Sequence, residues 1–202
     1  MSNNGTTQNV FLSGVGGQGT ILASNILGQV LLNAGYDVKK AEVHGMAQRG
    51  GDVTTHFRFG KKVHSPLIQQ GEVDFLVSFE LLEALRYINW VKPDGKVVLN
   101  NYSIFPPAVS LGTMQYPKDI DRTFRKYFKE NVFLINGSDI ARALGNIQAA
   151  NVVLLGAFSN FFPTLKADQW TEAIKGLLPS RLHELNLKAF HEGRAAIAAG
   201  NK

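Results

Sequence analysis

The stretch "NVFLSGVGGQGTILASNILGQVLLNAGYDVKKAEV", residues 9–43, decides the fold. Its first six residues are a short apolar run that ends in glycine, which is typical of a buried strand. From residue 20 to residue 34 the apolar side chains follow helical spacing, and Gly35 suits the position just after a helix. "YDVKKAEV" at the end of the stretch is predicted to be a second strand. A strand, a glycine turn, a helix and a strand make a βαβ unit.

The glycine turn "GVGGQG", residues 14–19, matches the pattern G-x-G-x-x-G in the context that dinucleotide binding requires. Its glycines allow close approach of a phosphate, and the following helix offers free N–H groups at its amino end. Glu42, near the end of the second predicted strand, could bind the ribose. The alternative is that the glycines only let the strand and the helix pack tightly. No Gly-Lys-Ser/Thr follows, so the turn is not a Walker A loop.

The remaining chain alternates strands and helices and then becomes helical. "DVTTHFRFG", residues 52–60, alternates apolar and polar side chains, which predicts an antiparallel or edge strand with one polar face. The other predicted strands are 73–79, the central one, 96–101 and 131–137. The predicted helices are 80–91, ended by "KPDG", then 119–130, 138–145, 149–161, 168–177 and 182–199, and residues 102–117 form a long connection.

This order predicts an α/β fold with three layers, α/β/α, around a mostly parallel, Rossmann-like sheet. A helical C-terminal segment begins at about residue 138. We expect one domain over residues 9–202, preceded by a flexible polar tail, residues 1–8.

Composition excludes several kinds of function. The chain has no cysteine, so it cannot supply thiolates to zinc or to an iron–sulfur cluster, or use a cysteine nucleophile. The net charge is +5, but the basic residues are scattered, so nucleic-acid binding is not expected. No apolar run is long enough to span a membrane, and the first residues do not resemble a secretory signal. A cytoplasmic location is the simplest expectation.

A second glycine-rich segment, "EVHGMAQRGG", residues 42–51, lies between two predicted strands. A plain turn needs one or two special residues. This segment has Gly45, Gly50 and Gly51, and it places Met46 and Arg49 between them. Methionine adapts to apolar interfaces, and arginine binds carboxylates or phosphates through two parallel hydrogen bonds. The composition therefore indicates a recognition loop as well as a turn.

Five blocks in fixed order carry a resemblance to a known family: "GVGGQGT" (14–20), "EVHGMAQRGGDV" (42–53), "SPLI" (65–68), "VDFLVSFELLEALR" (73–86) and "YP" (116–117). Together they resemble the gamma-type subunit or domain of the 2-oxoacid:ferredoxin oxidoreductases, and most of all the small (beta) subunit of the indolepyruvate enzymes. The resemblance covers roughly residues 8–190. Each block alone is weak, whereas the pair of glycine loops with "GMAQRGG" between strands is specific.

The resemblance implies a subunit of an enzyme that oxidatively decarboxylates a 2-oxoacid to an acyl-CoA and passes the electrons to ferredoxin. Indolepyruvate or another aryl pyruvate would be the substrate. Thiamine diphosphate, magnesium and iron–sulfur clusters would be bound by a larger catalytic subunit, with CoA as co-substrate. This chain would bind none of these cofactors alone and would be inactive in isolation. "PDGKVVLNN", residues 93–101, is too short to be the thiamine diphosphate motif.

We therefore expect the two glycine loops to form the face that docks on the catalytic subunit, near the mouth of its active site or the path of CoA. No residue of this chain is expected to be catalytic or to bind a metal. The alternative for Arg49 is a structural pair with Glu42 or Asp52, and for His44 a histidine bound to backbone groups. The expected ligand or interface residues are Gly14, Gly16, Gly17, Gln18, Gly19, His44, Gly45, Met46, Gln48, Arg49, Gly50 and Gly51.

Two other classes of function stay open. One is a free-standing oxidoreductase that binds NAD or FAD at the first glycine loop. The other is a non-enzymatic interaction domain with a vestigial loop. Saturable dinucleotide binding by the isolated chain would favour the first, and copurification with a larger, cysteine-rich subunit would favour the reading drawn from the family.

Overall fold

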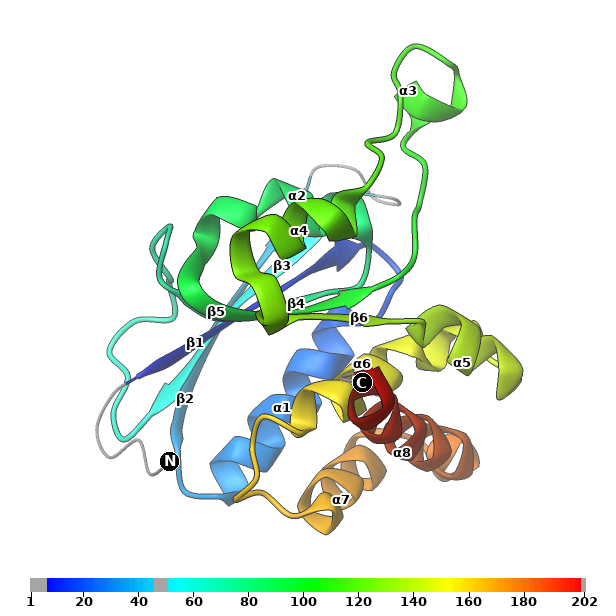
Figure 1. Cartoon of the computed structure of the whole chain (residues 1–202). Coiled ribbons are helices and arrows are strands. Elements are labelled where there is room, and N and C mark those ends of the chain that lie inside the picture. Colours follow the sequence, from blue (N-terminus) through cyan, green and yellow to red (C-terminus); the bar gives the residue numbers. More distant parts are fainter. Residues whose placement is uncertain (1–6, 46–50, 201–202) are drawn as a thin grey trace.

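A six-stranded sheet forms the centre of the molecule (Figure 1). The structure is a computed structural model that describes residues 7–45 and 51–200, the last three as backbone only. The spatial order of the strands is β2-β3-β1-β4-β5-β6. Pairs β1–β4, β4–β5 and β5–β6 are parallel, and β3 is antiparallel to both its neighbours. The strands are β1 (Gln8–Val15), β2 (Asp37–His44), β3 (Asp52–Gly60), β4 (Val73–Ser78), β5 (Val91–Asn100) and β6 (Val132–Ile135).

Helices cover both faces of the sheet, which gives the expected three layers (Figure 1). Helices α1, α6, α7 and α8 lie on one face, and α2 and α4 lie on the other. The α-helices are α1 (Thr20–Asn33), α2 (Leu81–Arg86), α3 (Pro107–Ser110), α4 (Ile120–Phe128), α5 (Gly137–Ala143), α6 (Ala150–Ser159), α7 (Ala167–Leu177) and α8 (His183–Gly200). Short 3-10 helices span Ile88–Trp90, Lys129–Asn131, Ile147–Ala149 and Ser180–Leu182.

The fold class, the mostly parallel sheet and the helical C-terminal part are as the sequence predicts. Gly35 follows α1 with φ 84°, in the left-handed region that glycine favours. The beginning of the chain differs slightly, because Gln8, which was assigned to the tail, is already paired with Phe59 in β1.

The position of β3 corrects two predictions. β3 is antiparallel, but it lies between β2 and β1, so it is not an edge strand and it separates the two strands of the βαβ unit. Most of its polar residues do not face solvent, because Thr54, Thr55 and His56 are buried and Arg58 is half-buried. His56 accepts a hydrogen bond at Nδ1 from the backbone N–H of Ile68, which gives this buried ring nitrogen a partner within the chain.

The helix predicted over residues 80–91 is also shorter than expected. It divides into α2 and the 3-10 turn Ile88–Trp90, and residues 92–95 belong to β5 instead of a turn. A register shift in the pairing of β5 with β4 between Val73 and Phe75 accommodates Pro93 in this strand.

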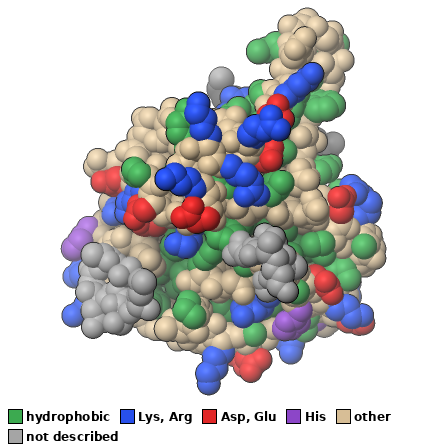
Figure 2. Space-filling view, in the orientation of Figure 1, with side chains coloured by type: hydrophobic (Ala, Val, Ile, Leu, Met, Phe, Trp, Pro, Cys, Tyr) green, Lys and Arg blue, Asp and Glu red, His purple; other side chains and the backbone are tan. Residues whose placement is uncertain are grey.

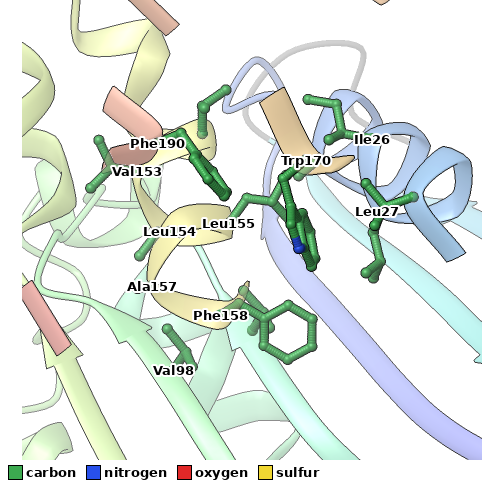
Figure 3. Packing of buried hydrophobic residues seen from close by; sticks show 14 of the residues in the cluster. Ile26, Leu27, Val98, Val153, Leu154, Leu155, Ala157, Phe158, Trp170 and Phe190 are labelled. Carbon is green, nitrogen blue, oxygen red and sulfur yellow. The ribbon is translucent and has the colours of Figure 1, made fainter. Parts of the chain in front are cut away.

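Two apolar clusters hold the layers together. The larger lies between the sheet and α1, α6, α7 and α8, and Figure 3 shows Trp170 of α7 and Phe190 of α8 beside α6, which contributes Phe158. The smaller lies under α2 and α4 and contains Phe11, Leu76 and Phe124. Helix α6 is buried along its whole length, because the sheet lies on one side of it and α8 on the other.

Residues 102–117 leave the body as a long projection, which we call the arm (Figures 1 and 2). The arm connects the end of β5 to α4 and carries α3 near its tip. Among the helices in the described part of the chain, none is both long enough and apolar enough to cross a membrane.

Candidate functional site

The first glycine loop lies where ligands usually bind in open α/β sheets. The chain leaves β1 toward α1 on one face, and it leaves the neighbouring strand β4 toward α2 on the other face. This divergence at the carboxyl end of adjacent parallel strands opens a crevice in doubly wound folds. Gly17 and Gly19 have φ angles of 98° and 79°, which glycine adopts without strain. Gly14 is packed so closely that a Cβ there would lie 3.0 Å from the Cβ of Phe79.

Gln18 fills the crevice from within the loop. Its Oε1 accepts a hydrogen bond of 2.7 Å from the N–H of Val15, and its Nε2 donates one of 2.8 Å to the carbonyl of Phe79. The side chain therefore joins the end of β1 to the end of β4. Among the residues expected to bind a ligand or partner, Gln18 is placed as a structural brace, since its amide O and one N–H are bound within the chain.

The described ends of the second glycine-rich segment, Gly45 and Gly51, lie at this edge, and Gly51 is beside the first glycine loop. The N–H of Gly16 donates to the carbonyl of Gly51 at 2.9 Å, and the N–H of Gly45 donates to the carbonyl of Asp52 at 2.8 Å. His44 is exposed at the end of β2, opposite Val53. Met46, Gln48, Arg49 and Gly50 lie outside the described residues.

An acidic group lies beside the second loop. The hydroxyl of Tyr87 donates to a carboxylate oxygen of Asp52 at 3.4 Å. Burial raises the pKa of Tyr87, and the negative charges of Asp52 and Glu83 raise it further. Burial also raises the pKa of Glu83, although its ion pair with Arg86 at 3.1 Å opposes the shift. One oxygen of Glu83, Oε2, is buried and has no hydrogen-bond partner among the described residues.

Glu80 fixes the root of the arm. This buried carboxylate follows β4 and caps α2 by accepting from the N–H of Glu83 at 2.8 Å. Its other oxygen accepts from the N–H of Ile104 at 3.0 Å and from the hydroxyl of Tyr116 at 2.5 Å. Residues 104 and 116 are on opposite legs of the arm, so one carboxylate holds both legs. Burial and this hydrogen bond to Glu80 raise the pKa of Tyr116.

A hollow of about 220 Å³ opens beside the first glycine loop, toward α6 and α8. Its polar lining is made of amide side chains. Asn151 donates from Nδ2 to the carbonyl of Gly19 at 3.2 Å, so it closes the hollow against the loop. The lining residues are Gly17, Gly19, Leu22, Asn146, Gln148, Ala149, Asn151, Leu178, Leu182 and Asn186.

Several residues that build this edge were not expected from the sequence. Tyr116, Asn100 and Asn151 each bind a backbone or side-chain group more than thirty residues away. Asn100 was visible as a polar residue near the end of the predicted strand 96–101, and strand ends are a common place for functional side chains. Nothing local distinguishes Asn151, since it lies inside an apolar helix. Within the described ranges, no group of three His, Asp or Glu side chains is placed to hold a metal ion.

Comparison with protein families gives a match over nearly the whole chain. Residues 9–196 match the family model described as pyruvate ferredoxin/flavodoxin oxidoreductase. The chain is 40% identical over 189 residues to the indolepyruvate oxidoreductase subunit IorB of Pyrococcus horikoshii, which covers 92% of this chain and 93% of that protein. It is 38% identical over 195 residues to the subunit of the same name from Archaeoglobus fulgidus, which covers 95% and 96%.

A solved structure has the same fold. The gamma subunit of a keto/oxoacid ferredoxin oxidoreductase from Geobacter sulfurreducens superposes with a TM-score of 0.71, covering 95% of this chain and 99% of that chain. The sequence identity of the pair is 22%, so this likeness concerns the arrangement of the helices and strands.

Proposed function

This chain belongs to the pyruvate ferredoxin/flavodoxin oxidoreductase family, and we propose that it is the small, gamma-type subunit of an enzyme that oxidises an aryl 2-oxoacid such as indolepyruvate. The relatives named as indolepyruvate oxidoreductase subunits support this substrate class. In this proposal the chain docks on a larger, cytoplasmic catalytic subunit that carries thiamine diphosphate, magnesium and iron–sulfur clusters. Electrons pass from that subunit to ferredoxin, and CoA accepts the acyl group.

One observation supports the docking proposal: the hydrogen bond from Gly16 to Gly51 brings the described end of the second glycine-rich segment beside the first glycine loop, where we place the docking surface. This surface lies at the carboxyl edge of the sheet, beside the point where the chain diverges to opposite faces. The expected recognition residues are those of the two loops, with Gln18 as the brace behind them. The exposed His44 and the ends of the second loop border the same surface.

The donor set of this chain does not fit the cofactors of such an enzyme. It has no cysteine, so it offers no thiolate to an iron–sulfur cluster. The segment that partly resembles a thiamine diphosphate motif, residues 93–95, lies within β5. There Gly95 packs against the carbonyls of Lys92 and Val73. No chemical step is therefore assigned to this chain.

The position of Glu42 in the sheet also argues against the alternative function, a free-standing oxidoreductase that binds NAD or FAD. In the dinucleotide-binding fold the acidic residue that binds the ribose is on the strand next to β1. Here β3 occupies that place, and Glu42 is one strand further away, roughly 9–10 Å at the usual strand spacing. Glu42 is moreover paired with Lys40 at 2.7 Å.

The direct test is reconstitution. The isolated chain, given thiamine diphosphate, Mg²⁺, CoA and a viologen dye, should not oxidise indolepyruvate. The same chain expressed together with the larger subunit should give dye reduction that depends on CoA and on the 2-oxoacid, faster with indolepyruvate than with pyruvate. Dye reduction by the chain alone, or saturable NAD or FAD binding by it at micromolar concentration, would contradict the proposal.

Arg49 tests the docking loop itself. Loss of a charge pair across an interface costs about 2–5 kcal/mol, which is roughly 30-fold or more in affinity. We therefore expect Arg49→Ala to weaken assembly and turnover while the melting temperature of the isolated chain stays unchanged. Arg49→Lys should restore assembly only in part, because an ammonium cannot form the planar pair of hydrogen bonds. Lys61→Ala, an exposed cation at the other end of the sheet, is the control. A fall in melting temperature with normal assembly would make Arg49 a structural residue.

A further inference from the structure

The arm, residues 102–117, is apolar and uncharged although it extends into solvent. No charged residue occurs between Lys96 and Lys118. Phe105, Leu111 and Met114 are 60%, 79% and 65% exposed, which are large fractions for such side chains. Single exposed apolar residues are common, but several on one projection mark an interaction site.

The arm is nevertheless held in a defined conformation by hydrogen bonds at its tip and root and by a contact between aromatic rings. The carbonyl of Ala108 accepts hydrogen bonds from the N–H groups of Thr113 and Met114 at 2.9 and 3.0 Å, which closes the tip after α3. Gly112 turns the chain there with φ 74°. The rings of Phe105 and Tyr116 lie 5.2 Å apart between the two legs. With Glu80 holding the root, the arm is ordered before it meets a partner, which lowers the entropic cost of binding.

A basic helix borders the arm. Helix α4 begins three residues after the arm ends, and Figure 2 shows Lys and Arg side chains over this part of the surface, below the projection. Arg122, Arg125, Lys126 and Lys129 are exposed, and within the described residues none of them forms an ion pair with a carboxylate.

The distribution of charge on the arm and α4 indicates which kind of partner binds them: a second copy of the chain, a lipid surface or another protein. A dimer with two-fold symmetry would set the arm and α4 of one copy against the same elements of the other, and like charges across an interface are unfavourable. A lipid surface is less suitable, because Asp119, Asp121 and Glu130 flank the four cations of this segment and reduce its net positive charge. A protein surface with an apolar pocket and carboxylates around it is complementary to both the arm and α4.

We propose that the arm and the exposed side of α4 form a second docking surface, separate from the glycine loops, that inserts Leu111 and Met114 into an acid-rimmed apolar pocket of the larger subunit of the same enzyme. This inference rests on the proposed function, which supplies the larger subunit. The arm leaves the same edge of the sheet as the glycine loops, so one partner can contact both surfaces.

The first experiment measures assembly. The chain is coexpressed with the tagged larger subunit, and the bound fraction is followed as the purified complex is diluted. Leu111→Ser with Met114→Ser should raise the dissociation constant by at least roughly tenfold, the scale of removing one buried apolar side chain. Leu67→Ser is the matched control, since Leu67 is 59% exposed in the connection at the opposite end of the sheet. It should assemble like the wild type.

The second experiment uses the absence of cysteine from the chain. Met114→Cys and Leu67→Cys each introduce a single thiol, whose rate of maleimide labelling is read on this chain by mass spectrometry. Both should react rapidly in the isolated chain. In the complex, Met114→Cys should be protected at least roughly tenfold, as expected for a thiol buried at an interface, while Leu67→Cys should not be.

The outcomes separate the inference from its premise. If the wild-type chain assembles and the arm variants assemble equally well, with no protection at residue 114, the arm is not a docking element and the proposed function stands. If the arm substitutions change only self-association of the isolated chain, or only binding to anionic lipid vesicles, the occupant is a second copy or a membrane and the inference is wrong. If the wild-type chain does not assemble with the larger subunit, both the function and the inference fail.

Discussion

At the scale of single residues, Gln18 is the side chain on which the shape of the first glycine loop depends. Gln18→Ala would leave the N–H of Val15 without this partner, whereas the carbonyl of Phe79 would keep the hydrogen bond from Asn100. We expect the free energy of unfolding to fall by about 1–3 kcal/mol, the usual cost of leaving a buried polar group unsatisfied. Urea unfolding followed by circular dichroism measures the change.

Gln29→Ala provides the control for this substitution. Gln29 is exposed on α1, and among the described residues its amide binds only the side chain of Asn33. Its replacement should change stability by less than about 0.5 kcal/mol. Equal effects of the two substitutions would mean that Gln18 does not brace the loop.

His56 predicts a dependence of stability on pH. Burial lowers the pKa of His56 below the ordinary value of 6.5, and its Nδ1 must stay unprotonated to accept from Ile68. The unfolded chain therefore takes up a proton at higher pH than the folded chain. The contribution of His56 to stability is complete above pH 6.5 and is lost as the pH falls through the lower pKa of the folded state.

The corresponding variant is His56→Asn, which retains an acceptor near the position of Nδ1 but does not titrate. The fall in the free energy of unfolding from pH 7 to pH 5 should be smaller in this variant than in the wild type. The exposed His64 serves as the control, and His64→Asn should keep the wild-type slope. An unchanged slope in His56→Asn would contradict the assignment.

Residue roles were the least predictable part of the site. The glycine positions and the closeness of the two loops follow from a strand–turn–helix pattern, because carboxyl ends of parallel strands share an edge. The bracing role of Gln18 could not be predicted from this pattern. It depends on the carbonyl of Phe79, which directly follows β4 and lies 61 residues further along the chain. For the same reason Glu80 could be recognised as a helix-capping residue but not as the anchor of the arm.

At the scale of elements, the contact of α6 with α8 depends on two glycines. A Cβ on Gly156 would collide with the carbonyl of Phe190, and a Cβ on Gly193 would collide with the carbonyl of Val153. Alanine favours a helix over glycine by about 1 kcal/mol, but overpacking costs about 1–3 kcal/mol or more. Gly156→Ala should therefore lower the midpoint of urea unfolding.

Gly176 on α7 gives the opposite result for the same exchange. Apart from the neighbouring backbone of α7 itself, no atom of the described residues lies within 4 Å of the position that a Cβ would take there. Gly176→Ala should raise stability by about 0.4–1 kcal/mol, since only the gain in helix propensity remains. If both substitutions stabilise the protein, the two helices do not approach as closely as described.

Element types were predictable where one structure dominates the local pattern, as in α1, β4 and α8. The prediction was wrong for the surroundings of β3, because alternation of apolar and polar residues also fits a strand whose polar side chains are buried and hydrogen-bonded. Sequence spacing cannot show that β3 enters between β1 and β2. That order is set by how the faces of three distant segments pack.

At the scale of the whole molecule, the sequence predicts one domain, and the two tryptophans can test this. Trp90 packs against the cluster under α2 and α4, and Trp170 is in the centre of the cluster on the other face. Trp170→Phe leaves Trp90 as the only tryptophan whose fluorescence reports unfolding, and Trp90→Phe leaves Trp170. If both faces unfold together, tryptophan fluorescence and far-ultraviolet circular dichroism should give the same urea midpoint in each variant. Separate midpoints in either variant would divide the chain into two folding units.

The order of the strands leaves β2 with an unpaired side, and β6 closes the other end of the sheet. An unpaired strand is a template for the strands of another molecule, and long apolar edges lead to aggregation. β6 avoids this because it has only four residues. β2 has eight, and it carries Lys39 and Lys40 with their partners Asp37 and Glu42. Because β3 lies inside the sheet, β2 is the edge strand instead, and its four charges disfavour pairing with the strands of another molecule.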